Sequence, residues 1–127
     1  MSNRLGKDRI ENEYKQHLLN LPVQRNHKVI FLDYVNNIDS FFKSIDLLVV
    51  PSLSYESFGM VILEAMYNKK AVICSNYGGM KEIVVDQYTG MIFESGNARH
   101  LAQCIDYVGS DPELCELLGS NGFKRLN

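Results

Sequence analysis

The chain has 127 residues, which corresponds to one domain or part of one. Hydrophobic residues make up 46 % and charged residues 22 %, as in ordinary globular proteins, and the formal net charge of −2 argues against a general nucleic-acid binder. No apolar run is long enough to span a bilayer, and no signal-peptide core follows the N-terminus. We therefore expect residues 1–127 to form a single soluble domain.

The elements alternate along the chain between short apolar runs typical of strands and runs of helical periodicity. The strands are expected at residues 28–32, 46–50, 71–74 and 91–93. The helices are expected at residues 8–20, 39–44, 59–68, 97–108 and 111–119, with one further short helix that ends at residue 85. Asp111 is a candidate N-cap of the last helix, because a proline follows it.

This alternation is typical of a parallel sheet that is covered by helices on both faces. In such sheets ligands bind beyond the carboxyl ends of the strands, at loops that lead into helices. The loops at residues 33–38, 51–58 and 75–80 should therefore share one edge of the sheet. Glu56 lies in the middle one.

The predicted helix 59–68 carries one charge, Glu64, and is otherwise apolar on nearly all sides. We therefore expect it to be buried rather than half exposed. No lysine or arginine lies three or four residues from Glu64, so nothing on this helix can pair with it. Gly59 lets a ligand approach the first turn closely, where unpaired backbone N–H groups attract a phosphate.

Each of the two glutamates also has a simpler explanation. Acidic residues such as Glu56 are favoured near the start of any helix, and Glu64 could lie on a narrow solvent-facing stripe. Together, with Gly59 between them, they favour a ligand with an anion in the middle and hydroxyl groups at both ends. A nucleotide sugar has that shape.

Cysteine and histidine spacing gives no sign of a metal site. Cys74, Cys104 and Cys115 match no zinc or redox motif, and the three histidines are isolated. We expect free thiols in a reducing cytoplasm, no metal and no cofactor.

The two glutamates and their surroundings closely resemble the retaining glycosyltransferases of the GT-B fold, the large family of glycosyl transferases group 1. The mark of that family is a glutamate, seven residues and a second glutamate, which here are Glu56 and Glu64. Further matching segments, from residue 29 onward, are Phe31-Leu32, Tyr34-Val35, Pro51-Ser52, Glu56-Ser57-Phe58-Gly59, Leu63-Glu64-Ala65-Met66, Gly78-Gly79, Glu82-Ile83-Val84 and Thr89-Gly90-Met91-Ile92-Phe93.

The resemblance implies a Rossmann-like three-layer α/β/α domain with a parallel sheet, the C-terminal donor-binding half of a GT-B fold. It implies that Glu56 holds hydroxyl groups of the donor sugar, which makes it the candidate catalytic residue. Glu64 would bind the ribose hydroxyls. Backbone amides at the start of the helix would meet the sugar and the pyrophosphate, from Ser57, Phe58, Gly59 and Met60.

The resemblance implies further contacts in two other loops. Tyr34 and Val35 would lie near the base. Gly78 and Gly79 would lie near the donor, although a plain turn that starts a helix explains them equally well. After the helix the chain departs from the family, which usually has glycine and proline there, and we expect Asn68 to adopt the left-handed conformation that ends the helix.

The implied activity is transfer of a sugar from a nucleoside diphosphate to an acceptor hydroxyl, in polysaccharide, lipopolysaccharide, capsule or glycolipid synthesis. The implied partner is the nucleotide sugar, and the full-length enzyme would be cytoplasmic or peripheral at the inner face of the membrane. The sequence names neither the base, nor the sugar, nor the acceptor.

Compared with the family, the chain lacks the N-terminal acceptor domain and the first strands of the donor half, which supply an arginine and a lysine to the pyrophosphate. We therefore expect the isolated chain to be inactive or nearly so. Loss of a central strand should also expose sheet edges that invite pairing, for instance in a homo-oligomer.

Two alternatives remain. The first is a noncatalytic Rossmann-like binding or assembly module that self-associates through the exposed sheet edge. The second is a Rossmann-like domain for another nucleotide, which ranks last because no G-x-G-x-x-G follows a strand.

Overall fold

A computed structural model describes residue 13 and residues 29–32, 35–52 and 59–126 of the chain. The chain divides into two compact units, Met1–Tyr34 and Val35–Asn127. In the first unit Glu13 is helical and exposed, which agrees with the helix predicted at residues 8–20, and the rest of that helix lies outside the described residues. No helix in the described part of the chain is long and apolar enough to cross a membrane.

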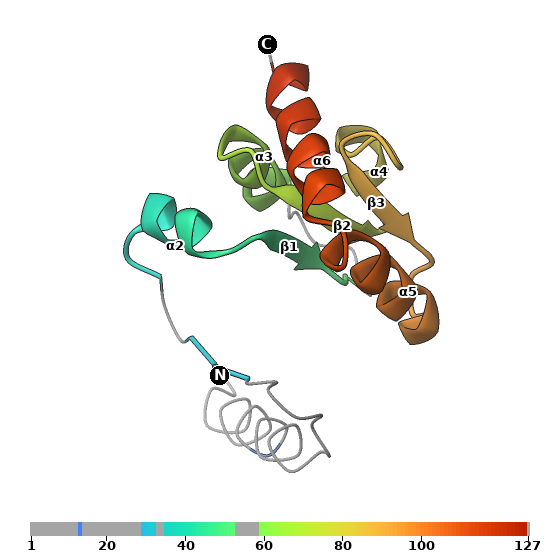
Figure 1. Cartoon of the computed structure of the whole chain (residues 1–127). Coiled ribbons are helices and arrows are strands. Elements are labelled where there is room, and N and C mark those ends of the chain that lie inside the picture. The colour runs from blue at the N-terminus through green and yellow to red at the C-terminus, as the bar shows by residue number, and fades with distance from the viewer. Residues whose placement is uncertain (1–12, 14–28, 33–34, 53–58, 127) are drawn as a thin grey trace. The chain divides into compact units, whose positions relative to one another are not determined.

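The second unit is built on a three-stranded parallel sheet (Figure 1). The strands are β1 (Leu47–Val50), β2 (Ala71–Ser75) and β3 (Gly90–Phe93), and they lie in the order β1-β2-β3. In the register Val50 faces Cys74 and Ser75 faces Phe93, so the carboxyl ends of all three strands meet at one edge. This confirms the predicted parallel sheet.

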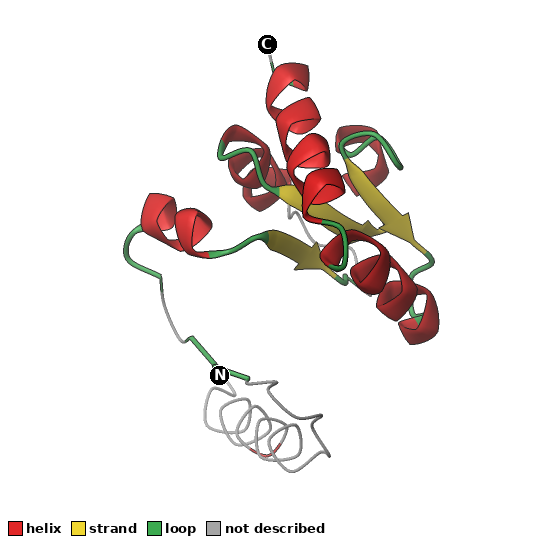
Figure 2. Ribbon diagram, in the orientation of Figure 1, coloured by secondary structure: helices red, strands yellow, loops and turns green. Residues whose placement is uncertain are grey.

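Helices cover both faces of the sheet (Figure 2). They are α2 (Ile38–Ser44), α3 (Gly59–Tyr67), α4 (Met80–Ile83), α5 (Ala98–Gly109) and α6 (Pro112–Arg125). Phe42 of α2 and Ile62, Ala65 and Met66 of α3 share one core cluster with Val72 and Cys74 of β2. The other cluster joins Cys104 and Val108 of α5 and Leu118 of α6 to Ala71 and Ile73 of β2. Successive β2 side chains therefore enter opposite cores, as the pleat of a strand requires.

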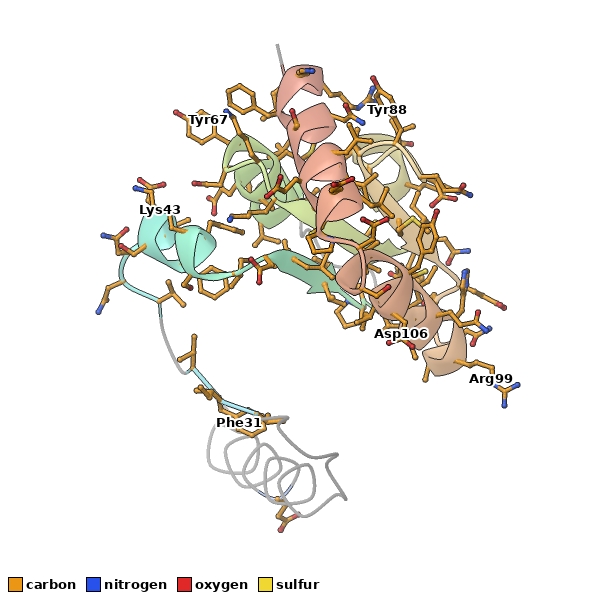
Figure 3. The ribbon with its side chains drawn as sticks, in the orientation of Figure 1. Phe31, Lys43, Tyr67, Tyr88, Arg99 and Asp106 are labelled. Atoms are coloured by element: carbon orange, nitrogen blue, oxygen red, sulfur yellow. The ribbon has the colours of Figure 1, made fainter. Side chains whose placement is uncertain are left out.

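Helix α3 is half exposed, so the expectation of a buried helix was wrong. Ile62, Ala65 and Met66 are buried, whereas Met60 and Tyr67 are each 67 % exposed. A helix of this length packs one face on the sheet, and its composition alone does not show whether another element covers the opposite face. The outward direction of Tyr67 is visible in Figure 3.

The end of α3 is a Schellman motif in which Lys69, rather than the expected Asn68, is left-handed. Lys69 has φ of 60°. The Lys70 N–H donates to the Ala65 carbonyl at 2.9 Å, and the Lys69 N–H donates to the Met66 carbonyl at 3.0 Å. The prediction was wrong by one residue because the Asn68 N–H still donates to the Glu64 carbonyl at 3.1 Å, as in a helix, and its side-chain Nδ2 donates to the same carbonyl at 2.8 Å.

The apolar run at residues 29–32 is not a strand, which corrects the prediction of one at 28–32. Ile30 is 65 % and Leu32 63 % exposed. An apolar run becomes a strand only where a neighbouring strand supplies hydrogen bonds, and the sheet of the described residues contains β1, β2 and β3 alone.

Helix α6 starts where predicted and ends later. The Asp111 side chain accepts a hydrogen bond from the Leu114 N–H at 3.1 Å, which confirms it as the N-cap before Pro112. The predicted end at residue 119 was wrong because Gly119 and Gly122 serve close packing. A Cβ at Gly119 would lie 2.1 Å from the Lys69 carbonyl oxygen.

Candidate functional site

The candidate site lies beyond the carboxyl ends of β1, β2 and β3, where the chain leaves the sheet through Pro51, residues 76–79 and Glu94. This agrees with the prediction that the loops after the second and third predicted strands share one edge. The predicted site residues outside the described part of the chain are Tyr34, Glu56, Ser57 and Phe58. Val35 is described, half-buried and outside any helix or strand.

Gly59 and Met60 form the start of α3, as predicted. Among the described residues, the atom nearest to a Cβ built on Gly59 would be Ile83 Cδ1 at 3.4 Å, an ordinary contact. Packing of the described residues therefore does not require a glycine here. The first N–H groups of a helix have no partner within it and attract anions.

Glu64 is half-buried on α3 and lines an open groove of about 480 Å³ between α3 and α2. Ile38 and Asp39 of α2 form the opposite wall. No described side chain donates a hydrogen bond to the Glu64 carboxylate or forms an ion pair with it. Such a carboxylate can accept hydrogen bonds from ligand hydroxyl groups.

Gly78 and Gly79 lie in the turn between β2 and α4. Gly78 has φ of 67°, a left-handed conformation that glycine adopts without strain, so the turn itself requires this residue. A Cβ on Gly79 would meet no described atom within 4 Å. The plain-turn explanation therefore accounts for Gly78, whereas Gly79 borders open space.

A group of polar residues that the sequence analysis missed joins the three strand ends. The Ser52 carbonyl oxygen accepts hydrogen bonds from Ser75 Oγ at 2.9 Å and from Ser95 Oγ at 3.2 Å. The Ser95 N–H donates to Asn76 Oδ1 at 2.9 Å. The available signal was a serine at the end of each apolar strand or within two residues after it.

The cysteines are free, in agreement with the expectation. Burial raises the pKa of the Cys74 thiol to about 12, with a smaller contribution from the charge of Asp86. Burial also raises the pKa values of Cys104 and Cys115. These thiols are therefore protonated at neutral pH and poor nucleophiles. Within the described ranges, no three His, Cys, Asp or Glu side chains gather closely enough to hold a metal ion.

The family model of the glycosyl transferases group 1 matches residues 6–125. An uncharacterised glycosyltransferase of Methanocaldococcus jannaschii is 41% identical over 87 residues, which are 68% of this chain and 24% of that protein. The capsular polysaccharide biosynthesis glycosyltransferase CapM of Staphylococcus aureus is 33% identical over 102 residues, 80% of this chain and 27% of CapM. The chain thus spans about a quarter of the length of these relatives.

Solved structures agree with this match. HepE of Anabaena, in complex with UDP and glucose, has a TM-score of 0.84 and 27% identity, and the similarity covers 95% of this chain and 32% of HepE. The C-terminal domain of the glycosyl transferase group 1 family protein LpcC from Francisella tularensis has a TM-score of 0.69 and 30% identity over 97% of this chain and 62% of that domain. The chain belongs to the glycosyl transferases group 1, and its fold is that of the C-terminal half of a GT-B glycosyltransferase.

Proposed function

We propose that this chain is the donor-binding part of a retaining glycosyltransferase, and that the donor is a nucleoside-diphosphate sugar bound beyond the carboxyl ends of the strands. HepE, which was solved with UDP and glucose and with UDP-glucose, supports this ligand class. CapM acts in capsular polysaccharide biosynthesis by its name, and a 30% identical relative from Rhizobium leguminosarum is named a lipopolysaccharide core biosynthesis mannosyltransferase. These names support an acceptor in surface polysaccharide synthesis.

The observation that carries the proposal is the position of Glu64. Its carboxylate has no described partner, and it lines a groove on the helix that starts at Gly59. Five residues of α-helix separate Gly59 from Glu64, about 7.5 Å along the axis at 1.5 Å per residue. That span fits a donor whose diphosphate meets the first amides of α3 and whose ribose hydroxyls donate to Glu64.

In the proposed mechanism the protein contributes mainly by holding the donor. Glu56 would bind hydroxyl groups of the transferred sugar, and the amides at the start of α3 would bind the diphosphate. As the glycosidic bond breaks, negative charge grows on the leaving diphosphate, and these amides stabilise it together with cations from outside these 127 residues. The chain alone would therefore bind the donor while transferring little sugar. The proposal assigns no role to a metal, and it places the domain in a reducing cytoplasm, where the three thiols remain free.

Glu64→Gln tests the proposal, since it keeps the shape of the side chain and removes its charge. We expect the dissociation constant for UDP-glucose to rise about tenfold or more, because hydrogen bonds to charged groups contribute roughly 1.5–3 kcal/mol. NMR titration of the isotope-labelled chain measures this constant even in the millimolar range. Glu116→Gln, the same change at an exposed position of α6, should leave it unaltered.

Gly59→Ala separates binding from folding in the same titration. The nearest described atom would be 3.4 Å from the new methyl group, so the chain should fold normally. A methyl group at the start of α3 should nevertheless weaken UDP-glucose binding. Unchanged affinity in both the Glu64 and the Gly59 variants would overturn the proposal.

One observation favours the second candidate, a noncatalytic module that self-associates. Strand β1 lies at an edge of the sheet and, among the described residues, pairs with β2 alone. The unpaired backbone groups of an edge strand can pair with another chain. This candidate requires self-association in solution and no nucleotide-sugar binding.

A further inference from the structure

A single buried carbonyl oxygen, that of Ser52, ties together the ends of all three strands. Ser52 is the second residue after β1, Ser75 is the last residue of β2, and Ser95 is the second residue after β3. Both Ser75 Oγ, at 2.9 Å, and Ser95 Oγ, at 3.2 Å, donate to this oxygen. A carbonyl oxygen has two lone pairs, so the two hydroxyl groups satisfy it fully.

The burial of these groups makes the arrangement specific. Ser75 is fully buried and Ser52 is 9 % exposed, so water reaches this carbonyl poorly. Loss of either donor would remove a hydrogen bond from this oxygen in a protein interior, which is unfavourable. The Ser52 carbonyl therefore has one strongly preferred position relative to β2 and β3.

A second set of hydrogen bonds connects Asn76, in the loop after β2, to β3 and to Ser95. Asn76 follows β2 directly, and its N–H donates to the Phe93 carbonyl at 2.9 Å. Its side-chain Oδ1 accepts from the Ser95 N–H, also at 2.9 Å. Ser95 is thus held from two sides, by Asn76 and by Ser52. We call Ser52, Ser75, Asn76 and Ser95 the strand-end clasp.

We propose that Ser75 and Ser95 are positioning residues of the donor site. They act through the Ser52 carbonyl, which lies four residues before Glu56 in the sequence. Fixing this carbonyl fixes the point from which the chain departs toward Glu56 and α3. The inference rests on the proposed donor site, because a clasp at this edge matters for binding only if the donor binds there.

The test uses Ser95→Ala, Ser95→Thr and the double change of Ser75 and Ser95 to Ala in the full 127-residue chain. UDP-glucose is titrated by NMR, and urea unfolding is measured in parallel. We expect Ser95→Ala to raise the dissociation constant about three- to tenfold, the usual effect of one lost hydrogen bond. Ser95→Thr keeps the hydroxyl group and should restore binding to about the wild-type value.

The double variant should weaken binding by more than the product of the two single effects. Each single change leaves the other hydroxyl group on the shared oxygen, whereas the double change removes both hydroxyl groups. If the Ser75→Ala change at this buried position prevents folding, Ser95→Ala and Ser95→Thr still test the proposal, because Ser95 is only half-buried. Ser110→Ala is the matched control, because its hydroxyl group also donates to a carbonyl oxygen, that of Asp106 at the far end of α5.

The outcomes separate this inference from the proposed function. Wild-type affinity in Ser95→Ala and in the double variant, with Glu64→Gln still weakening binding, overturns the clasp alone. An equal loss of affinity in Ser110→Ala, in step with lost stability, shows general destabilisation and also overturns it. An unchanged chain that gives no UDP-glucose shifts overturns the proposed function and this inference together.

Discussion

Two glycines of the second unit, Gly90 and Gly79, differ in whether the packing around them requires a residue without a side chain. A Cβ on Gly90 would lie 2.1 Å from the Val72 carbonyl oxygen and 3.0 Å from Val84 Cγ1. At Gly79 no described atom would lie within 4 Å. The first glycine is therefore required by the sheet, and the second is not required by described packing.

Gly90→Ala should destabilise the protein by about 3 kcal/mol or more, because backbone oxygens of a paired strand cannot move aside as a flexible side chain can. Gly79→Ala should change the free energy of unfolding by less than about 0.5 kcal/mol. Urea unfolding followed by circular dichroism compares the two variants. Equal stability of the two would contradict the close approach of β2 and β3 at Gly90.

The role of Glu64 as a site residue remains a prediction, but the sequence did show correctly that its helix offers the carboxylate no basic partner. The spacing of charges along one helix showed that no basic residue of α3 could pair with its carboxylate, and among the described residues this carboxylate has no partner. The strand-end clasp was out of reach, because Ser75 and Ser95 are 23 and 43 residues from Ser52. Such hydrogen bonds depend on the register between strands, which a single sequence does not display. Glu56 remains a prediction.

At the level of single elements, helix starts were predicted better than helix ends. Local capping sets a start, as at Asp111, whose side chain accepts from the backbone within its own first turn. An end depends on what packs there. The helix predicted to end at residue 119 continues as α6 to Arg125, and Gly119 and Gly122 within it pack against residues that precede β2.

Asp111→Ala should lower the free energy of unfolding by about 1 kcal/mol, the usual effect of losing an N-cap. Asp106→Ala, on the exposed side of α5 (Figure 3), is the control and should have little effect, since it removes a carboxylate of the same kind without a capping bond. Chemical unfolding of the three proteins gives the comparison. An equal effect at Asp106 and at Asp111 would show that the change in net charge, rather than the loss of capping, matters.

For the molecule as a whole, the α/β class, the parallel sheet and the helices on both faces were predictable from the sequence. Continuous apolar runs such as β2, whose five residues are all buried, have few alternatives in a chain of this composition. Which apolar residues are exposed to solvent was less predictable. The exposed face of α3 and the exposed apolar run at residues 29–32, which is not a strand, both depend on which neighbours are present.

The isolated chain should sediment as a monomer that binds UDP-glucose. Strand β1 is only four residues long, and short edge strands offer few hydrogen bonds to another chain. Sedimentation velocity across a wide range of concentrations, with and without UDP-glucose, measures this. A dimer that forms as the concentration rises, from a chain that does not bind the nucleotide sugar, would instead support the self-associating module.

The alternation of β2 side chains between the two cores has a consequence for cooperativity. Ala71 and Ile73 belong to one cluster, while Val72 and Cys74 belong to the other. Each cluster takes two side chains from this one strand, so displacing the strand disrupts both clusters. Heating should therefore produce one calorimetric transition for residues 35–126. A destabilising substitution in the cluster beneath α5 should also destabilise the cluster beneath α3.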